Sequence, residues 1–175
     1  MKLERSVTKP YWTELKEILK GQIDSEQVLT PRDGVRRVWC NKDRCAYVIT
    51  EKVTGDIQPI AWLYLWQRPR WQAWEVLQVF VPEALRGKGL STRLYKAAVN
   101  DGLILASGKS QTKSSRALWK SFIKKKIFNV YAVDFKNLDL TSEVLIDKDD
   151  NELWCTLDIY SDNKHQDVRF VATRK

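Results

Sequence analysis

A chain of 175 residues with 43% hydrophobic residues, 30% charged residues and a net charge of +8 fits one soluble domain, 1–175, with its own core. No apolar run reaches the roughly 18 residues of a membrane span, and the first residues lack the apolar core of a signal peptide, so a cytoplasmic protein without membrane contact is expected. One histidine and three cysteines without metal-ligand spacing argue against a zinc site, a histidine-based triad or a disulfide framework.

The first part of the chain predicts one helix and then a series of strands. Apolar residues recur at helical spacing over 10–20, and a polar loop follows over 22–34. β-Branched and aromatic residues then predict strands, and these cover 35–40, 45–53, 59–66 and 74–81.

Helices and strands alternate in the remainder. A helix is predicted over 90–100, a short buried strand over 103–106, a second helix over 114–125 and a strand over 129–135. Ser114 or Ser115 is the expected N-cap of the second helix. Two final strands, 153–160 and 168–173, are expected to pair antiparallel around a turn at Asp162.

A basic glycine turn joins the strand 74–81 to the helix that begins at Leu90. The strand ends at Pro82, and the turn contributes Arg86, Lys88 and two glycines before the helix starts. A strand–glycine turn–helix arrangement presents unpaired backbone N–H groups at the positive end of the helix dipole, which is a ready anion site. The sequence therefore predicts that this turn binds a phosphate or pyrophosphate.

This order resembles motif A of the GCN5-related N-acetyltransferases, the GNAT family, with Ser91 at a position where the family has Gly or Ala. The resemblance covers about 11–135, leaves 138–175 as a C-terminal extension of strands, and implies a mixed α/β fold with a central, mostly antiparallel twisted sheet and flanking helices. It also implies acetyl-CoA as the small-molecule acyl donor. The residues that it assigns to acetyl-CoA are Val79, Phe80, Val81, Arg86, Gly87, Lys88, Gly89, Leu90 and Ser91.

The resemblance also suggests a general base. In many members of the family a glutamate stands six residues before the Val of Val-Pro, and that position is Glu75 here. Strand alternation would place 75, 77, 79 and 81 on one face. The alternative is that Glu75 forms an ion pair with Arg68, Arg70 or Lys52.

The family's general acid, a tyrosine on the helix after the fifth strand, has no clear equivalent. Ser121 stands at its position and Ser114 at that of the accompanying asparagine. Either Ser121 orients the thioester, or water protonates the thiolate, or Tyr131 or Tyr95 does so. A further alternative is a GNAT-fold protein that binds without turnover.

The positive charge and the aromatic residues suggest a partner surface. The turn between Trp66 and Trp74 carries Arg68, Arg70 and Trp71, which together suit stacking on bases and contacts with phosphates. The alternative is that the tryptophans pack inward and the arginines are only solvated. The expected function is acetyl transfer from acetyl-CoA to an amine, and the charge is compatible with an acceptor on nucleic acid or an acidic protein.

Overall fold

A computed structural model describes residues 34–53, 56–68, 71–108, 111–134, 144–145 and 168–175. The expected helix over 10–20, the loop up to residue 33 and the expected strand over 153–160 lie outside these residues. Within them, no helix is long and apolar enough to cross a membrane.

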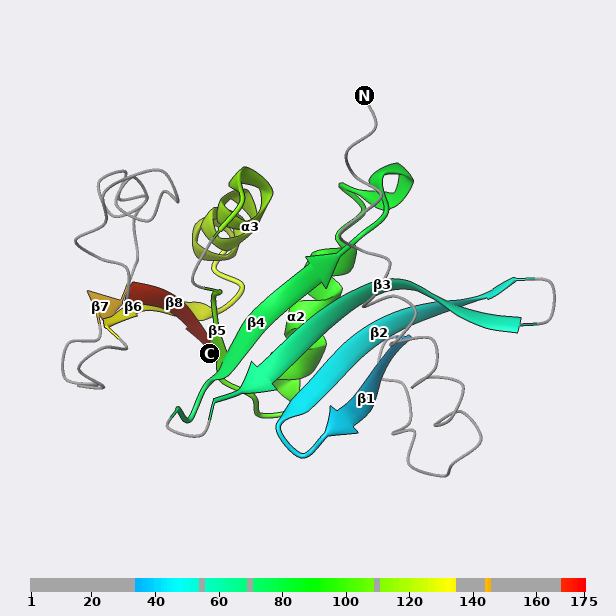
Figure 1. Cartoon of the computed structure of the whole chain (residues 1–175). Helices are drawn as coiled ribbons and strands as arrows, with labels where there is room; N and C mark the ends of the chain where they lie inside the picture. The colour runs from blue at the N-terminus through cyan, green and yellow to red at the C-terminus, as the bar shows by residue number, and fades with distance from the viewer. Residues whose placement is uncertain (1–33, 54–55, 69–70, 109–110, 135–143, 146–167) are drawn as a thin grey trace.

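The described strands form one mixed sheet in the order β1-β2-β3-β4-β5-β8-β6-β7 (Figure 1). All neighbouring pairs are antiparallel except β4 and β5, so the predicted class, a mostly antiparallel sheet with helices, is confirmed. The strands are β1 Val35–Asn41, β2 Arg44–Val53, β3 Asp56–Gln67, β4 Trp74–Phe80, β5 Leu105–Ala106, β6 Asn129–Asp134, β7 Val144–Leu145 and β8 Val168–Thr173.

Two α-helices and one short 3-10 turn complete the described part. Helix α2, Leu90–Asn100, has the predicted bounds, and the 3-10 turn η1 covers Glu83–Leu85. Helix α3, Lys113–Lys124, begins one residue earlier than predicted, because its N-cap is Thr112 and not a serine. The Thr112 side-chain oxygen accepts a hydrogen bond from the Ser115 N–H at 3.2 Å, so Ser115 is the donor to the cap.

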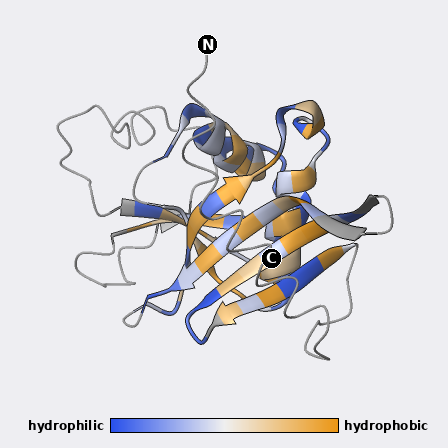
Figure 2. Ribbon diagram, turned by 45° about the vertical axis from the view of Figure 1, so that its right-hand side comes forward, coloured by the Kyte–Doolittle hydropathy of each residue, from blue (hydrophilic) through white to orange (hydrophobic). Residues whose placement is uncertain are grey.

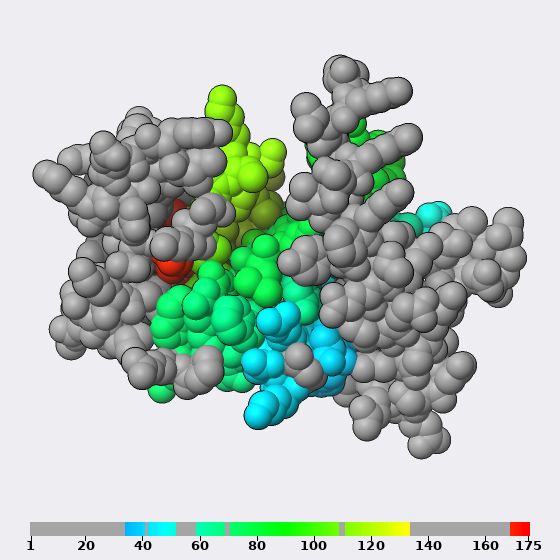
Figure 3. Space-filling model, viewed as in Figure 1, coloured from blue at the N-terminus to red at the C-terminus, as the bar shows by residue number. Residues whose placement is uncertain are grey.

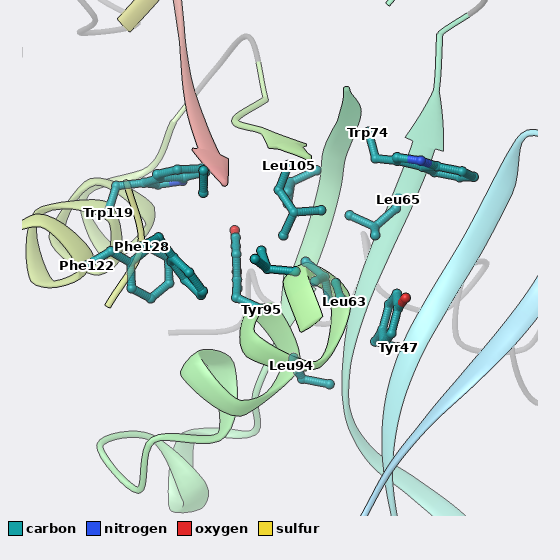
Figure 4. Packing of buried hydrophobic residues seen from close by; sticks show 14 of the residues in the cluster. Tyr47, Leu63, Leu65, Trp74, Leu94, Tyr95, Leu105, Trp119, Phe122 and Phe128 are labelled. Atoms are coloured by element: carbon teal, nitrogen blue, oxygen red, sulfur yellow. The ribbon is translucent and has the colours of Figure 1, made fainter. Parts of the chain in front are cut away.

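Both helices contribute to one core on the same face of the sheet. Helix α2 lies behind β3 and β4 in Figure 1 and buries Leu94, Tyr95, Ala98 and Val99. Figure 4 shows the ring of Tyr95 close to Trp119 and Phe122 of α3, with centroids 5.8 and 5.0 Å away. Hydrophobic residues mark the central strands in Figure 2, as burial of the sheet requires.

The last strand of the chain lies inside the sheet. β8 pairs with β6 along its whole length and with β5 at Val171 and Ala172. The prediction that 168–173 pairs with 153–160 is therefore wrong for β8, whose two neighbours are β5 and β6. A short apolar strand gives no local signal of its partner, because register and neighbours depend on distant segments.

Candidate functional site

A β-bulge interrupts β4 at Leu77. Leu65 of β3 pairs with Val76 and Tyr64 pairs with Gln78, so Leu77 has no partner on β3 and is 41% exposed. A bulge of one extra residue reverses the side-chain alternation beyond it. Val76 and Val79 consequently contribute to the same core, the one that contains α2.

The bulge corrects one prediction about the site. Glu75 precedes Val76 and lies on the face opposite α2, whereas Val79 lies on the α2 face. On the Glu75 side of the sheet, the ring of Phe80 stacks on Trp62 with centroids 4.1 Å apart. The expectation that 75, 77, 79 and 81 share one face is wrong, because it assumed an unbroken strand.

Strands β4 and β5 are paired only briefly. The parallel ladder joins Trp74 to Leu105 and Glu75 to Ala106. Beyond it the chain stays with β8, since the Ser107 N–H donates to Phe170 O at 2.8 Å and its Oγ accepts from the Phe170 N–H at 3.0 Å. Within the described strands, β4 therefore continues through Val76–Phe80 without a strand on its β5 side, and Figure 1 shows it leaving β5 and β8. That edge can pair with an extended ligand.

The turn after β4 has the backbone of an anion site. Gly87 and Gly89 have φ values of 80° and 77°, which side-chain-bearing residues rarely adopt, and a Cβ built on either would meet nothing within 4 Å. Gly89 is the N-cap of α2, so no side chain caps the first N–H groups of the helix. The space above both glycines is therefore open to a ligand.

The charges around this turn favour an anion. The first turn of α2 contains no acidic residue, and Arg86 and Lys88 are both exposed. Arg86 folds back on the end of β4, where its Nε donates to Val81 O at 3.3 Å. The helix dipole and two cations therefore act in the same direction.

Glu75 is buried and bonded to an arginine. Its side chain is 4% exposed, and its Oε2 accepts a hydrogen bond from Arg68 Nε at 2.5 Å. This is one of the ion pairs that the sequence left open. Among the described residues, Oε1 accepts no hydrogen bond. Arg68 thus holds one oxygen, and no described residue donates to the other.

The three candidate general acids, Ser121, Tyr95 and Tyr131, lie at separate places in the structure. The Ser121 hydroxyl donates to Leu118 O at 2.7 Å, one turn back in α3. Tyr95 is enclosed in the aromatic core, where burial raises the pKa of its phenol. Tyr131 packs at the edge of a separate cluster on β6. Burial raises the pKa of the Cys45 thiol to about 12, which disfavours its thiolate form.

The turn between Trp66 and Trp74 is split between core and surface. Trp74 is buried, with its ring 5.9 Å from that of Trp39, so it belongs to the core. The ring of Trp66 has two guanidinium groups near it, that of Arg44 at 5.4 Å and that of Arg68 at 4.4 Å. Figure 3 shows the molecule from the same side as Figure 1, with α2 behind the sheet. Atoms of β2 to β4, coloured cyan to green, lie at this surface. Arg70 lies outside the described residues.

The sequence analysis missed Gln111. This residue precedes the N-cap of α3 in the segment after β5, and its side chain is 5% exposed. Its Oε1 is buried and accepts no hydrogen bond from the residues that the structure describes. Buried polar atoms are nearly always satisfied, so this oxygen is an exception among the described residues. No sequence signal could have found it, because burial of a loop glutamine depends on the packing around it.

Replacing Gln111 by Met should stabilise the protein. An unsatisfied buried polar group costs about 1–3 kcal/mol, and Met has a similar shape without that cost. We expect the free energy of unfolding, from urea denaturation, to rise by about 1 kcal/mol. The matched control is Gln78→Met, which removes the bond from Trp62 Nε1 to Gln78 Oε1 at 3.3 Å and should destabilise the fold. A stability loss in Gln111→Met would contradict the assignment.

Comparison with known proteins gives structural neighbours only. No family model and no curated protein matches the sequence. Among solved structures, IAA acetyltransferase from Bacillus cereus ATCC 14579 is similar with a TM-score of 0.40 and 18% identity, over 77% of this chain and 79% of that one. A protein of the GNAT family from Bacteroides thetaiotaomicron is similar with a TM-score of 0.42 and 11% identity, over 96% of this chain and 82% of that one.

Proposed function

We propose that this protein is an N-acetyltransferase that transfers the acetyl group of acetyl-CoA to an amine. The observation that carries the proposal is the open turn at Gly87 and Gly89, placed directly after a strand whose edge has no partner among the described strands. A long donor with a pyrophosphate at one end and amide groups along its arm matches both features. The sequence resemblance to GNAT motif A points to the same donor.

The binding part of this proposal uses backbone groups. The N–H groups at the start of α2, together with Arg86 and Lys88, would bind the pyrophosphate. The free edge of β4 at Val79, Phe80 and Val81 would pair with the extended arm of the donor. Isothermal titration calorimetry with acetyl-CoA and with CoA tests this part directly.

The chemistry would take place beside Glu75. Acetyl-CoA supplies the acetyl group as a thioester. Glu75 Oε1 would take the proton of the acceptor ammonium, and the freed amine would attack the thioester carbonyl carbon. Backbone N–H groups of β4 would stabilise the oxyanion until the carbon–sulfur bond breaks. A water molecule would carry the remaining proton from the attacking nitrogen to the leaving thiolate, since Ser121 donates within α3 and Tyr95 is enclosed in the core.

Glu75→Gln should reduce kcat by about 10²-fold or more, a typical effect of losing a general base. The amide oxygen can still accept the Arg68 Nε–H, so the fold should remain, but the amide cannot take a proton. The measurement is thiol release from acetyl-CoA in the presence of an amine acceptor. Glu51→Gln, on an exposed residue of β2, is the control and should be unchanged. An unaltered rate in Glu75→Gln would mean that Glu75 is not the general base and serves only in the ion pair with Arg68.

The second candidate is a protein that binds acetyl-CoA without turnover. The engagement of the Ser121 hydroxyl by Leu118 O favours it, because the position of the family's general acid then has no free proton donor. Tight acetyl-CoA binding with no thiol release for any tested amine would support this candidate over transfer.

A further inference from the structure

The guanidinium of Arg68 is held in a fixed orientation by three groups. Its Nε donates to Glu75 Oε2 at 2.5 Å, and its central carbon lies 4.4 Å from the ring centroid of Trp66 and 5.0 Å from that of Trp71. A free arginine loses rotamer entropy when it is immobilised. Here the fold has already fixed the side chain, so a ligand that binds it loses less.

The outer edge of this guanidinium is unused. Only Nε makes a hydrogen bond or ion pair with a described residue, so the two Nη atoms carry N–H donors without acceptors. The side chain is 39% exposed, whereas that of Glu75 is 4% exposed. Glu75 therefore meets Arg68 from within the protein, while the Arg68 side chain that carries the two Nη groups is partly exposed. Such a fork suits a carboxylate or a phosphate, which can accept two parallel hydrogen bonds.

Its position links it to the acceptor. Glu75 pairs with Ala106, the last residue of β5 beside β4, so Arg68 is bonded to the residue at which the two strands part. We propose that Arg68 binds an oxyanion of the acceptor, a carboxylate or phosphate carried close to its amino group. The amine would lie at Glu75 Oε1 and the oxyanion at the Nη atoms of Arg68. This inference rests on the proposed function and adds the chemical class of the acceptor.

NMR of protein labelled with 15N-arginine tests the inference without turnover. The probes are two matched pairs, O-phosphoethanolamine with ethanolamine and β-alanine with propylamine. We expect the Arg68 Nε–H signal to shift and to saturate with the anionic member of at least one pair. The concentration needed should be about tenfold or more below that needed with the other member of the pair, which lacks the anionic group. The pair that responds tells phosphate from carboxylate. Equal responses within both pairs, or no saturable shift with any probe, would overturn the inference.

Variants identify the site. Arg68→Lys keeps the charge but removes the guanidinium fork and its Nε–H. The Nε–H signal that is missing from the spectrum of this variant is therefore that of Arg68. Binding of the probes to Arg68→Lys is followed through the tryptophan indole N–H signals, and this variant should no longer prefer the anionic probe. Arg44→Gln removes the other cation beside Trp66 and should keep that preference. If Arg44→Gln loses the preference as Arg68→Lys does, general positive charge explains it and the inference fails.

The proposed function is tested separately in the same samples. Arg68→Lys should bind acetyl-CoA as the parent does, because Arg68 does not belong to the turn before α2. Gly89→Glu should keep the Arg68 response to the probes. A parent protein that binds acetyl-CoA normally but shows no preference for the anionic probes would reject this inference alone, whereas absence of acetyl-CoA binding by the parent would reject the proposed function.

Discussion

Gly89→Glu is expected to abolish acetyl-CoA binding, with an affinity loss of about 100-fold or more. The substitution places a carboxylate in the open space above the N-cap of α2, where the pyrophosphate of acetyl-CoA is proposed to bind. Juxtaposed like charges cost several kcal/mol, and about 1.4 kcal/mol corresponds to a factor of ten. The measurement is isothermal titration calorimetry of the purified variant and parent.

Two controls separate charge from backbone strain. Gly89→Ala meets the same φ of 77°, which costs about 1–2 kcal/mol in the fold, but it adds no charge. Gly102→Glu combines a φ of 87° with the same new carboxylate at the opposite end of α2, where a Cβ also meets nothing within 4 Å. We expect acetyl-CoA to bind Gly102→Glu like the parent and Gly89→Ala only modestly less well. Equal affinities of Gly89→Glu and the parent would remove the anion site from the proposed function.

Trp119→Ala should lower the free energy of unfolding by about 3–5 kcal/mol, the usual range for removing a buried large aromatic side chain. Trp119 is fully buried, and its ring centroid lies 5.8 Å from that of Tyr95, 5.7 Å from Phe122 and 6.0 Å from Phe170. The ring thus joins α2, α3 and β8, as Figure 4 shows for Tyr95 and Phe122. Because small domains have only about 5–15 kcal/mol of stability, the loss is a large fraction of the total.

Urea denaturation followed by far-UV circular dichroism measures this loss without relying on tryptophan fluorescence. Leu77→Ala is the control, because Leu77 is 41% exposed at the bulge and its truncation should change stability by about 0.5 kcal/mol or less. A small effect of Trp119→Ala would mean that α3 is not held to the sheet by this aromatic cluster.

Local patterns predicted most of the elements that frame the site. β-Branched and aromatic residues located β1 to β4, and a stripe at helical spacing located α2 with its observed bounds. The glycines at 87 and 89 predicted a turn before α2, and both adopt positive φ. These features are local, since a turn type, a helix stripe and a strand alternation are each contained within a few consecutive residues.

The candidate site was predictable only in part. Glu75 was a candidate because it stands six residues before Val81 in the sequence, and Arg68 was one of three cations considered as its partner. The sequence could not choose among them, because the choice depends on how β3 and the following turn lie against β4. Gln111 escaped notice for the same reason, since only the packing around α3 makes it buried and unpaired.

The amino-acid sequence by itself determined the mixed α/β class, the turn that presents the start of α2 and the residue types available for chemistry. Only the tertiary structure decided that a bulge at Leu77 places Glu75 and Val79 on opposite faces, and that β8 lies between β5 and β6. It also decided that Arg68 meets Glu75 between two tryptophans. The physical reason is that strand register and the partners of buried charges depend on segments far apart in the chain, which no local pattern encodes.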